Sequence, residues 1–218
     1  MTGNQISNAS LDFVTTLAQA AARLRAKMGD RNASSQENYP PPKVVTEALL
    51  HAEKAAKQQH QRYPVDSLLG YWRLCFTTSG KVHLRQSIVS GKRGFYVPQI
   101  SPAQISFTTP ASTTDSSPDD VEIGNQVQLG PLLFRLTGQT RYLDQKNLLA
   151  FDFTHMQLSL FGKTLYQGTF PWRKTQAQDF HNQPLSKLPF FTFFLITEDF
   201  IAARGRGGGL ALWVKEFH

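Results

Sequence analysis

From about Leu68 onwards, apolar and polar residues alternate with a period of two, in short runs separated by turn residues. This period places successive side chains on opposite faces of a β-strand. Many short strands at close spacing predict an antiparallel sandwich or barrel. The 16 Phe residues among 218 favour β structure with a bulky interior, and the polar stretch at 110–120 is expected to be a loop.

Two amphipathic helices are expected before the strands. The first ends at Gly29 and the second begins at Pro42, because glycine suits a helix C-terminus and proline suits a first helical turn. The linker between them, at 30–42, is polar and ends in three prolines. The sequence therefore divides into an N-terminal helical extension at 1–65 and a β domain at 66–218.

Charge and cysteine content narrow the function classes. The formal net charge is +7, but no block of about five or six like charges occurs, so nucleic acid is not an expected partner. A basic surface suits an anionic membrane or an acidic protein. The single cysteine, Cys75, excludes a disulfide framework or a zinc cluster within one chain. No spacing indicates a metal site or a catalytic set, which favours a protein that is not an enzyme.

The sequence gives no sign of secretion or of a membrane-spanning helix. The first residues lack the basic and apolar regions of a secretory signal. The most apolar stretch, LPFFTFFLI at 188–196, is too short to cross a bilayer as a helix. We therefore expect a soluble or peripheral protein.

The segment Arg204-Gly-Arg-Gly-Gly-Gly209 lies between the alternating runs DFIAAR and GLALWVK. Glycine supplies the positive φ of hairpin turns, so this segment is predicted to be a hairpin turn. A phosphate-binding P-loop would open a helix and end in Gly-Lys-Ser/Thr, and this segment does neither.

Gly70, Trp72 and Arg204 are predicted to close one end of a barrel. Gly70 and Trp72 open the first strand, and Arg204 ends the penultimate strand. An early and a late strand pair when a small barrel closes. The Trp72 indole is then expected to pack under the Arg204 guanidinium in a cation–π contact, which leaves the other end as a mouth.

Strand parity defines a candidate ligand-binding wall. Trp72, Leu74 and Phe76 are expected to share one face of the first strand. The predicted wall consists of the aromatic residues Phe76, Phe151, Phe153, Phe191 and Phe193. His83 and Arg85 are predicted to form a polar pair at the mouth that meets a head group or carboxylate. Such a wall suits a lipophilic ligand, although aromatic stripes are also ordinary core.

A second candidate surface is the run FPWRK at 170–174. It joins aromatic and cationic residues beside a turn, which is typical of a membrane interface. The predicted membrane-facing patch consists of Phe170, Trp172, Arg173 and Lys174.

The runs LLGYWRLCFTTSG and FIAARGRGGGLALWVKE resemble the first and last strands of the plastid lipid-associated proteins, also called fibrillins. The resemblance covers 68–217. It implies an antiparallel lipocalin-like (calycin) β-barrel, here with two N-terminal α-helices, in a cyanobacterial-type member of the family. It also implies non-enzymatic binding, carriage or organisation of a lipid, carotenoid or isoprenoid quinone, with no other cofactor. The implied place is the cytoplasmic side of a thylakoid or a lipid-droplet (plastoglobule) surface in a cyanobacterium or plastid.

Two other functions stay open. With a filled barrel, the protein would be a scaffold or assembly module for a membrane-associated enzyme, and the N-terminal helices would bind a protein partner. The lipocalin-like bilin lyases of cyanobacteria share the same general plan, and His83, Arg85, Arg135 and Asp152 are candidates to contact a tetrapyrrole. Periodicity reports which way side chains face, so it does not decide between a hollow and a filled barrel.

Overall fold

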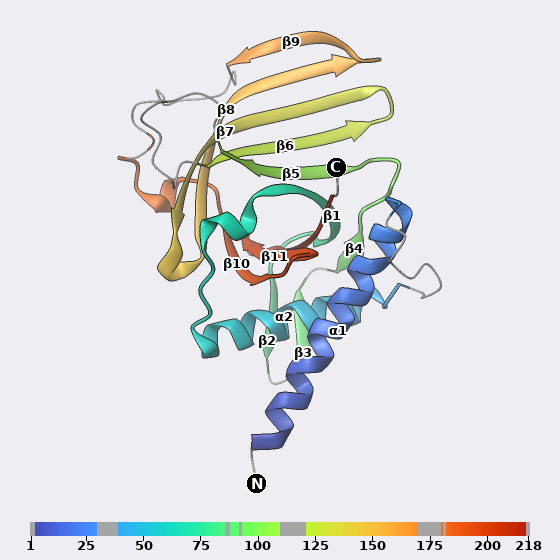
Figure 1. The fold of residues 1–218 in the computed structure, drawn as a ribbon, viewed down its shortest axis with the longest axis vertical. Coiled ribbons are helices and arrows are strands. Elements are labelled where there is room, and N and C mark those ends of the chain that lie inside the picture. The colour runs from blue at the N-terminus through green and yellow to red at the C-terminus, as the bar shows by residue number, and fades with distance from the viewer. Residues whose placement is uncertain are drawn as a thin grey trace.

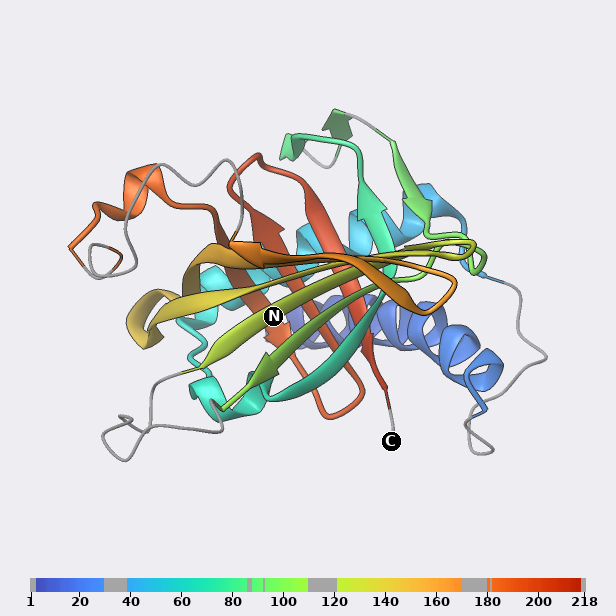
Figure 2. The same cartoon turned by 90° about the horizontal axis from the view of Figure 1, so that it is seen from above.

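Antiparallel strands form a sheet that curls into a ring that nearly closes, with two helices against one side (Figure 1). The computed structural model describes residues 3–29, 39–85, 88–91, 93–109, 121–169, 180 and 182–216. Seen from above, the strands cross over the two helices (Figure 2). The predicted antiparallel β architecture is therefore confirmed at this level.

Helix α1 spans Gly3–Lys27 and helix α2 spans Pro42–Gln59. Proline suits the first turn of α2 because its fixed φ matches the helix and its missing N–H would have no partner there. The helix ends at His60, which adopts a left-handed conformation with φ 50°. Short 3-10 helices lie in the described connections: η1 (Val65–Leu68), η2 (Asp144–Lys146) and η4 (Leu185–Lys187).

The strands follow the alternating runs of the sequence. Their bounds are β1 Gly70–Thr78, β2 Val82–Arg85, β3 Ile88–Gly91, β4 Gly94–Tyr96, β5 Ala103–Thr108, β6 Glu122–Leu129, β7 Leu132–Leu143, β8 Leu148–Leu160, β9 Lys163–Thr169, β10 Phe190–Ile196, β11 Phe200–Gly205 and β12 Leu210–Lys215. The predicted loop at 110–120 lies outside the described residues. The strands β2 and β3 form a separate hairpin, and β4 pairs with β1.

Strand order explains both the ring and the part of the sheet that extends beyond it. The main sheet runs β10-β11-β12-β1-β5-β6-β7-β8-β9, and β10 also pairs with β8. This closing contact is short, since residues 190–192 pair with residues 148–150. From His155 onwards, β8 pairs with β9 instead. The strands β6 to β9 therefore continue past the ring as a single sheet, at the top of Figure 1.

The two larger buried clusters of the described residues lie on the two faces of the sheet, and alternation along β11 and β12 separates them. Ala202 and Leu212 face the helices and pack with the leucines of α1 and α2, which we call the outer core. Ile201 and Trp213 face the inside of the ring, which we call the interior core. The apolar stripes of α1 and α2 are thus covered by the sheet.

A β-bulge changes the facing of β1. The pairing of β1 with β12 shifts register between Leu74 and Phe76. Leu74 packs on the interior core, but Cys75 and Phe76 both belong to the outer core. The extra residue of a bulge turns the side chains that follow it to the other face. The expectation that Phe76 shares a face with Trp72 is therefore wrong, and Phe76 is not part of the interior wall.

The glycine-rich segment is the hairpin turn that its position in the sequence predicts. It joins β11 to β12, which pair as antiparallel neighbours. The amide of Gly208 donates to the carbonyl of Gly205 at 2.8 Å. Gly208 has φ 83°, a conformation that L-residues with side chains rarely adopt.

Candidate functional site

The predicted aromatic wall forms a packed cluster inside the ring. Phe151 stacks on Phe191 with ring centroids 5.2 Å apart, and Phe153 lies 5.2 Å from Phe151. Phe193 is 1% exposed and meets Phe107 edge to face at 6.0 Å. Four of the five residues that strand parity predicted for the wall therefore lie together in one cluster. They contact one another as an ordinary core does, so they fill the part of the ring that they occupy.

Trp72 and Arg204 lie on opposite faces of the sheet. Trp72 belongs to the interior core, and its indole N–H donates to the Leu68 carbonyl at 2.7 Å. The cation over its ring is Lys215, with Nζ 5.2 Å from the centroid. Arg204 follows Ala203, which faces inward, so its side chain points outward towards α2. The expected contact between Trp72 and Arg204 is therefore replaced by one between Trp72 and Lys215.

Gly70 takes part in this arrangement through its backbone. It begins β1 with φ 124°, and a Cβ there would lie 3.4 Å from Cε of Lys215. Gly70 pairs with Phe107 across β1 and β5. Gly70 thus supplies an unusual backbone conformation beside the lysine that covers Trp72.

Arg204 ties the ring to α2. Its Nε and Nη2 donate to the two carboxylate oxygens of Glu53 at 2.8 and 2.5 Å. Its Nη1 donates to the carbonyls of Val82 and Gly208. Burial raises the pKa of the Glu53 carboxyl, but hydrogen bonds from Arg204 and Lys57 outweigh this effect and hold the pKa below its ordinary value. A bidentate arginine–carboxylate pair in this setting fixes the orientation of α2.

An open groove of about 800 Å³ lies beside this ion pair. We call it the basic groove. Its walls come from α2, from the residues at the start of β2 and from the β11–β12 turn. The lining residues are Leu50, His51, Glu53, Lys54, Lys57, Gln58, Lys81, His83, Arg204 and Gly208. His83, predicted at a barrel mouth, therefore lies in this groove outside the ring, and the side chain of its predicted partner Arg85 lies outside the described part of the structure.

The sheet beyond the ring has one apolar and one polar face. Register places Val127, Phe134 and Leu158 in one row, with Met156 and Leu136 in the next. These side chains are half-buried and continue the face that forms the interior core within the ring. We call this surface the apolar face. A single-layer sheet with an apolar face needs a second layer to cover it.

The opposite surface, which we call the polar face, carries a row of amides and a guanidinium. Gln126 pairs with Arg135, Arg135 with Gln157, and Gln157 with Gln167. The Arg135 guanidinium donates to Oε1 of Gln126 at 3.1 and 2.8 Å. Asp152 also lies on this side, since it alternates with the inward Phe151 and Phe153. His83, Arg135 and Asp152, three of the residues considered for tetrapyrrole contact, therefore do not line one cavity within the ring.

The predicted membrane-facing patch, Phe170, Trp172, Arg173 and Lys174, lies outside the described residues. Other large apolar side chains are exposed, and several lie on β9, on loops or at the end of β6. These include Ile100, Leu129, Phe161, Leu165 and Tyr166. Leu129 and Phe161 come from neighbouring hairpin tips, since the Phe161 amide donates to the Pro131 carbonyl at 2.9 Å.

Reactive groups are few among the residues that the structure describes. That part of the chain contains no group of three or more His, Cys, Asp or Glu side chains able to hold a metal ion. Burial raises the pKa of the Cys75 thiol to about 12. Within the same residues, no helix has the length and apolar character needed to cross a membrane.

Sequence reasoning missed Glu53, Lys54 and Lys81. A signal for Glu53 was present, because it lies four residues after Leu49 and so falls on the apolar stripe of α2. A carboxylate at such a position needs a partner. The partner, Arg204, is 151 residues away, which no local pattern reveals.

No protein-family model matches the chain, and no curated protein matches it either. The architecture is that of an antiparallel β-ring with two helices packed on one side. A basic groove lies outside the ring, and an apolar face lies on the part of the sheet that extends past the ring.

Proposed function

We propose that the protein is a non-enzymatic binding protein that carries or organises a hydrophobic molecule, and that the ligand covers the apolar face of strands β6 to β9. The observation that carries this proposal is the row of half-buried apolar side chains beyond the ring, including Phe134, Met156 and Leu158. Apolar surface of this kind is typically an interaction site.

The ligand class is that of a lipid, carotenoid or isoprenoid quinone. The resemblance to plastid lipid-associated proteins supports this class, as does the nearly closed ring, which is compatible with a lipocalin-like barrel. The packed interior core favours a ligand that lies against the apolar face over one enclosed within the ring. Leu129 and Phe161 are exposed at the hairpin tips. If the protein docks on a photosynthetic membrane, these two side chains would insert into its apolar region.

The test is organic extraction of natively purified protein, followed by mass spectrometry and an absorption spectrum. A stoichiometric lipophile is expected. The variant Met156→Lys places a charge on the apolar face and should lose the lipophile. The neighbouring variant Gln157→Lys places the same charge on the polar face and serves as the matched control. An empty wild-type protein, or equal loss in both variants, contradicts the proposal.

The aromatic packing inside the ring favours one alternative, a scaffold or assembly module for a membrane-associated enzyme. In Figure 1, α1 extends past the body of the protein towards its N-terminus, where a partner can reach it. Removing residues 1–12 spares the buried Leu17 and Leu24 of α1. Under this alternative, the truncated protein stays folded but no longer co-purifies with its partner, and no lipophile is extracted from the intact protein.

A further inference from the structure

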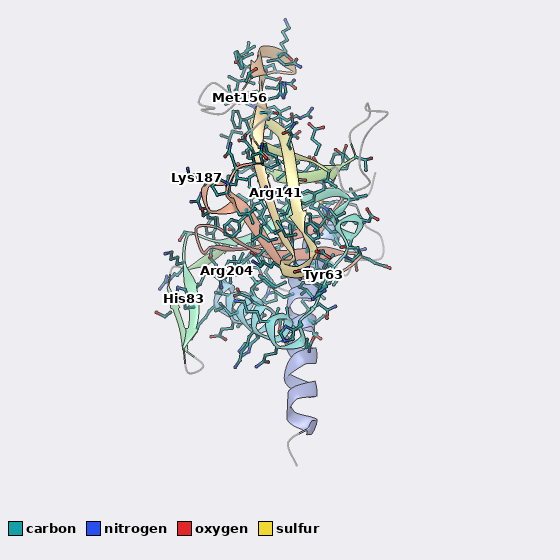
Figure 3. All side chains as sticks on the ribbon, turned by 90° about the vertical axis from the view of Figure 1, so that its left-hand side faces the viewer. Tyr63, His83, Arg141, Met156, Lys187 and Arg204 are labelled. Carbon is teal, nitrogen blue, oxygen red and sulfur yellow. The ribbon has the colours of Figure 1, made fainter. Side chains whose placement is uncertain are left out.

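The basic groove concentrates positive charge from three separate parts of the chain. His51, Lys54 and Gln58 recur at helical spacing and present one side of α2 to the groove. Lys81 and His83 come from the start of β2, opposite the helix. The groove lies on the helix side of the molecule, whereas Met156 marks the distant end of the sheet (Figure 3). The groove and the apolar face are therefore separate surfaces.

The acidic residue of the groove is already occupied. Glu53 holds Arg204 through both oxygens and also accepts a hydrogen bond from Lys57 at 2.9 Å. Four cationic side chains and this single carboxylate line the groove, which is an excess of three positive charges when the histidines are left out of the count. Lys54 and Lys81, both exposed, are the lysines of the groove that the internal ion pair does not involve.

The glycine-rich turn shapes the groove without forming a P-loop. A Cβ at Gly208 would lie 2.5 Å from Cγ of Lys81, so the absence of a side chain at this position lets the lysine stem cross the turn. The Gly208 carbonyl also accepts from Nη1 of Arg204 at 2.5 Å. The turn therefore positions two cations at one wall.

We propose that the basic groove binds a phosphate dianion carried by a larger molecule. A phosphate monoester carries about two negative charges near neutral pH, so it would offset most of the excess positive charge of the groove. The volume of about 800 Å³ is within the range of small-molecule sites and exceeds what inorganic phosphate fills. Lysine ammonium groups bind phosphate as point charges, and the imidazole N–H groups of His51 and His83 add further hydrogen-bond donors. The phosphate belongs either to a soluble phosphorylated compound or to a lipid head group.

The experiment titrates the full chain at low ionic strength with inorganic pyrophosphate, followed by backbone amide NMR, and in parallel with vesicles that contain phosphatidic acid. Saturable shifts are expected at residues 81–83 and 207–209. The substitutions Lys54→Ala and Lys81→Ala should each weaken binding roughly two- to fivefold, the effect of one exposed charge contact. Together they should weaken binding about tenfold if they act independently.

Lys163→Ala is the matched control, because it removes the same charge from β9 at the opposite end of the molecule. Binding of pyrophosphate without binding to vesicles indicates a soluble ligand. Vesicle binding that pyrophosphate competes away indicates a lipid head group. The proposal is overturned if neither probe gives saturable binding, or if Lys163→Ala weakens pyrophosphate binding as much as Lys54→Ala and Lys81→Ala do. Thermal melts confirm that the exposed-lysine variants stay folded.

Discussion

The ion pair between Arg204 and Glu53 gives the sharpest test of how α2 is held on the ring. The two side chains are only 20% and 11% exposed, so solvent screens their interaction weakly. The variant Arg204→Met keeps a similar volume but removes the guanidinium. It leaves the Glu53 carboxylate with Lys57 alone, and it leaves the carbonyls of Val82 and Gly208 without this donor.

The expected loss in the free energy of unfolding is about 4 kcal/mol. Removing one partner of a buried ion pair costs roughly 3–5 kcal/mol, because the other charge stays buried without compensation. Lys57 reduces this cost by its remaining contact with Glu53, while each carbonyl left without its donor adds about 1 kcal/mol. Replacing both charges, in Glu53→Gln with Arg204→Met, should cost less than the sum of the two single changes, by about 2 kcal/mol.

Urea unfolding of wild type, both single variants and the double variant measures this coupling. The pKa of Glu53 is lowered in the folded state, so its contribution to stability is present above its ordinary value near 4.5 and is lost as the pH falls through the lowered value. The stability difference between wild type and Arg204→Met should therefore shrink on acidification. A coupling energy below about 0.5 kcal/mol, or a difference that does not change with pH, would refute the ion pair as the anchor of α2.

Two further predictions concern the outer core. Burial raises the pKa of the Cys75 thiol to about 12, so the native protein should not react with a thiol reagent at about pH 8. The urea-unfolded protein should react fully. Rapid reaction of the native protein would contradict the burial of this thiol. A Cβ at Gly94 would lie 2.1 Å from Cζ of the buried Phe76, so Gly94→Ala should lower the free energy of unfolding by roughly 1–3 kcal/mol. Gly207→Ala is its control in the same unfolding assay, since a Cβ at Gly207 meets nothing within 4 Å, and equal effects of the two changes would exclude the clash as the cause.

Some residues of the candidate sites could be predicted from the sequence, and others could not. Parity along single strands correctly grouped Phe151, Phe153, Phe191 and Phe193, because each pair lies two residues apart on a regular part of its strand. Parity failed at Phe76, because a bulge has no reliable local signature in the sequence. The basic groove was not predictable, since it joins residues from α2, the start of β2 and the β11–β12 turn.

The sequence by itself determined the local structure: where the helices lie, which runs form strands and where the glycine-rich turn falls. These features depend on side-chain periodicity and backbone preferences within a few residues. Only the tertiary structure decided which cation covers Trp72, which face Phe76 occupies and which partner Arg204 meets. Each of these depends on the pairing of strands and helices far apart in the chain, and the ion pair between residues 53 and 204 exists only because closing the ring against α2 brings its two ends together.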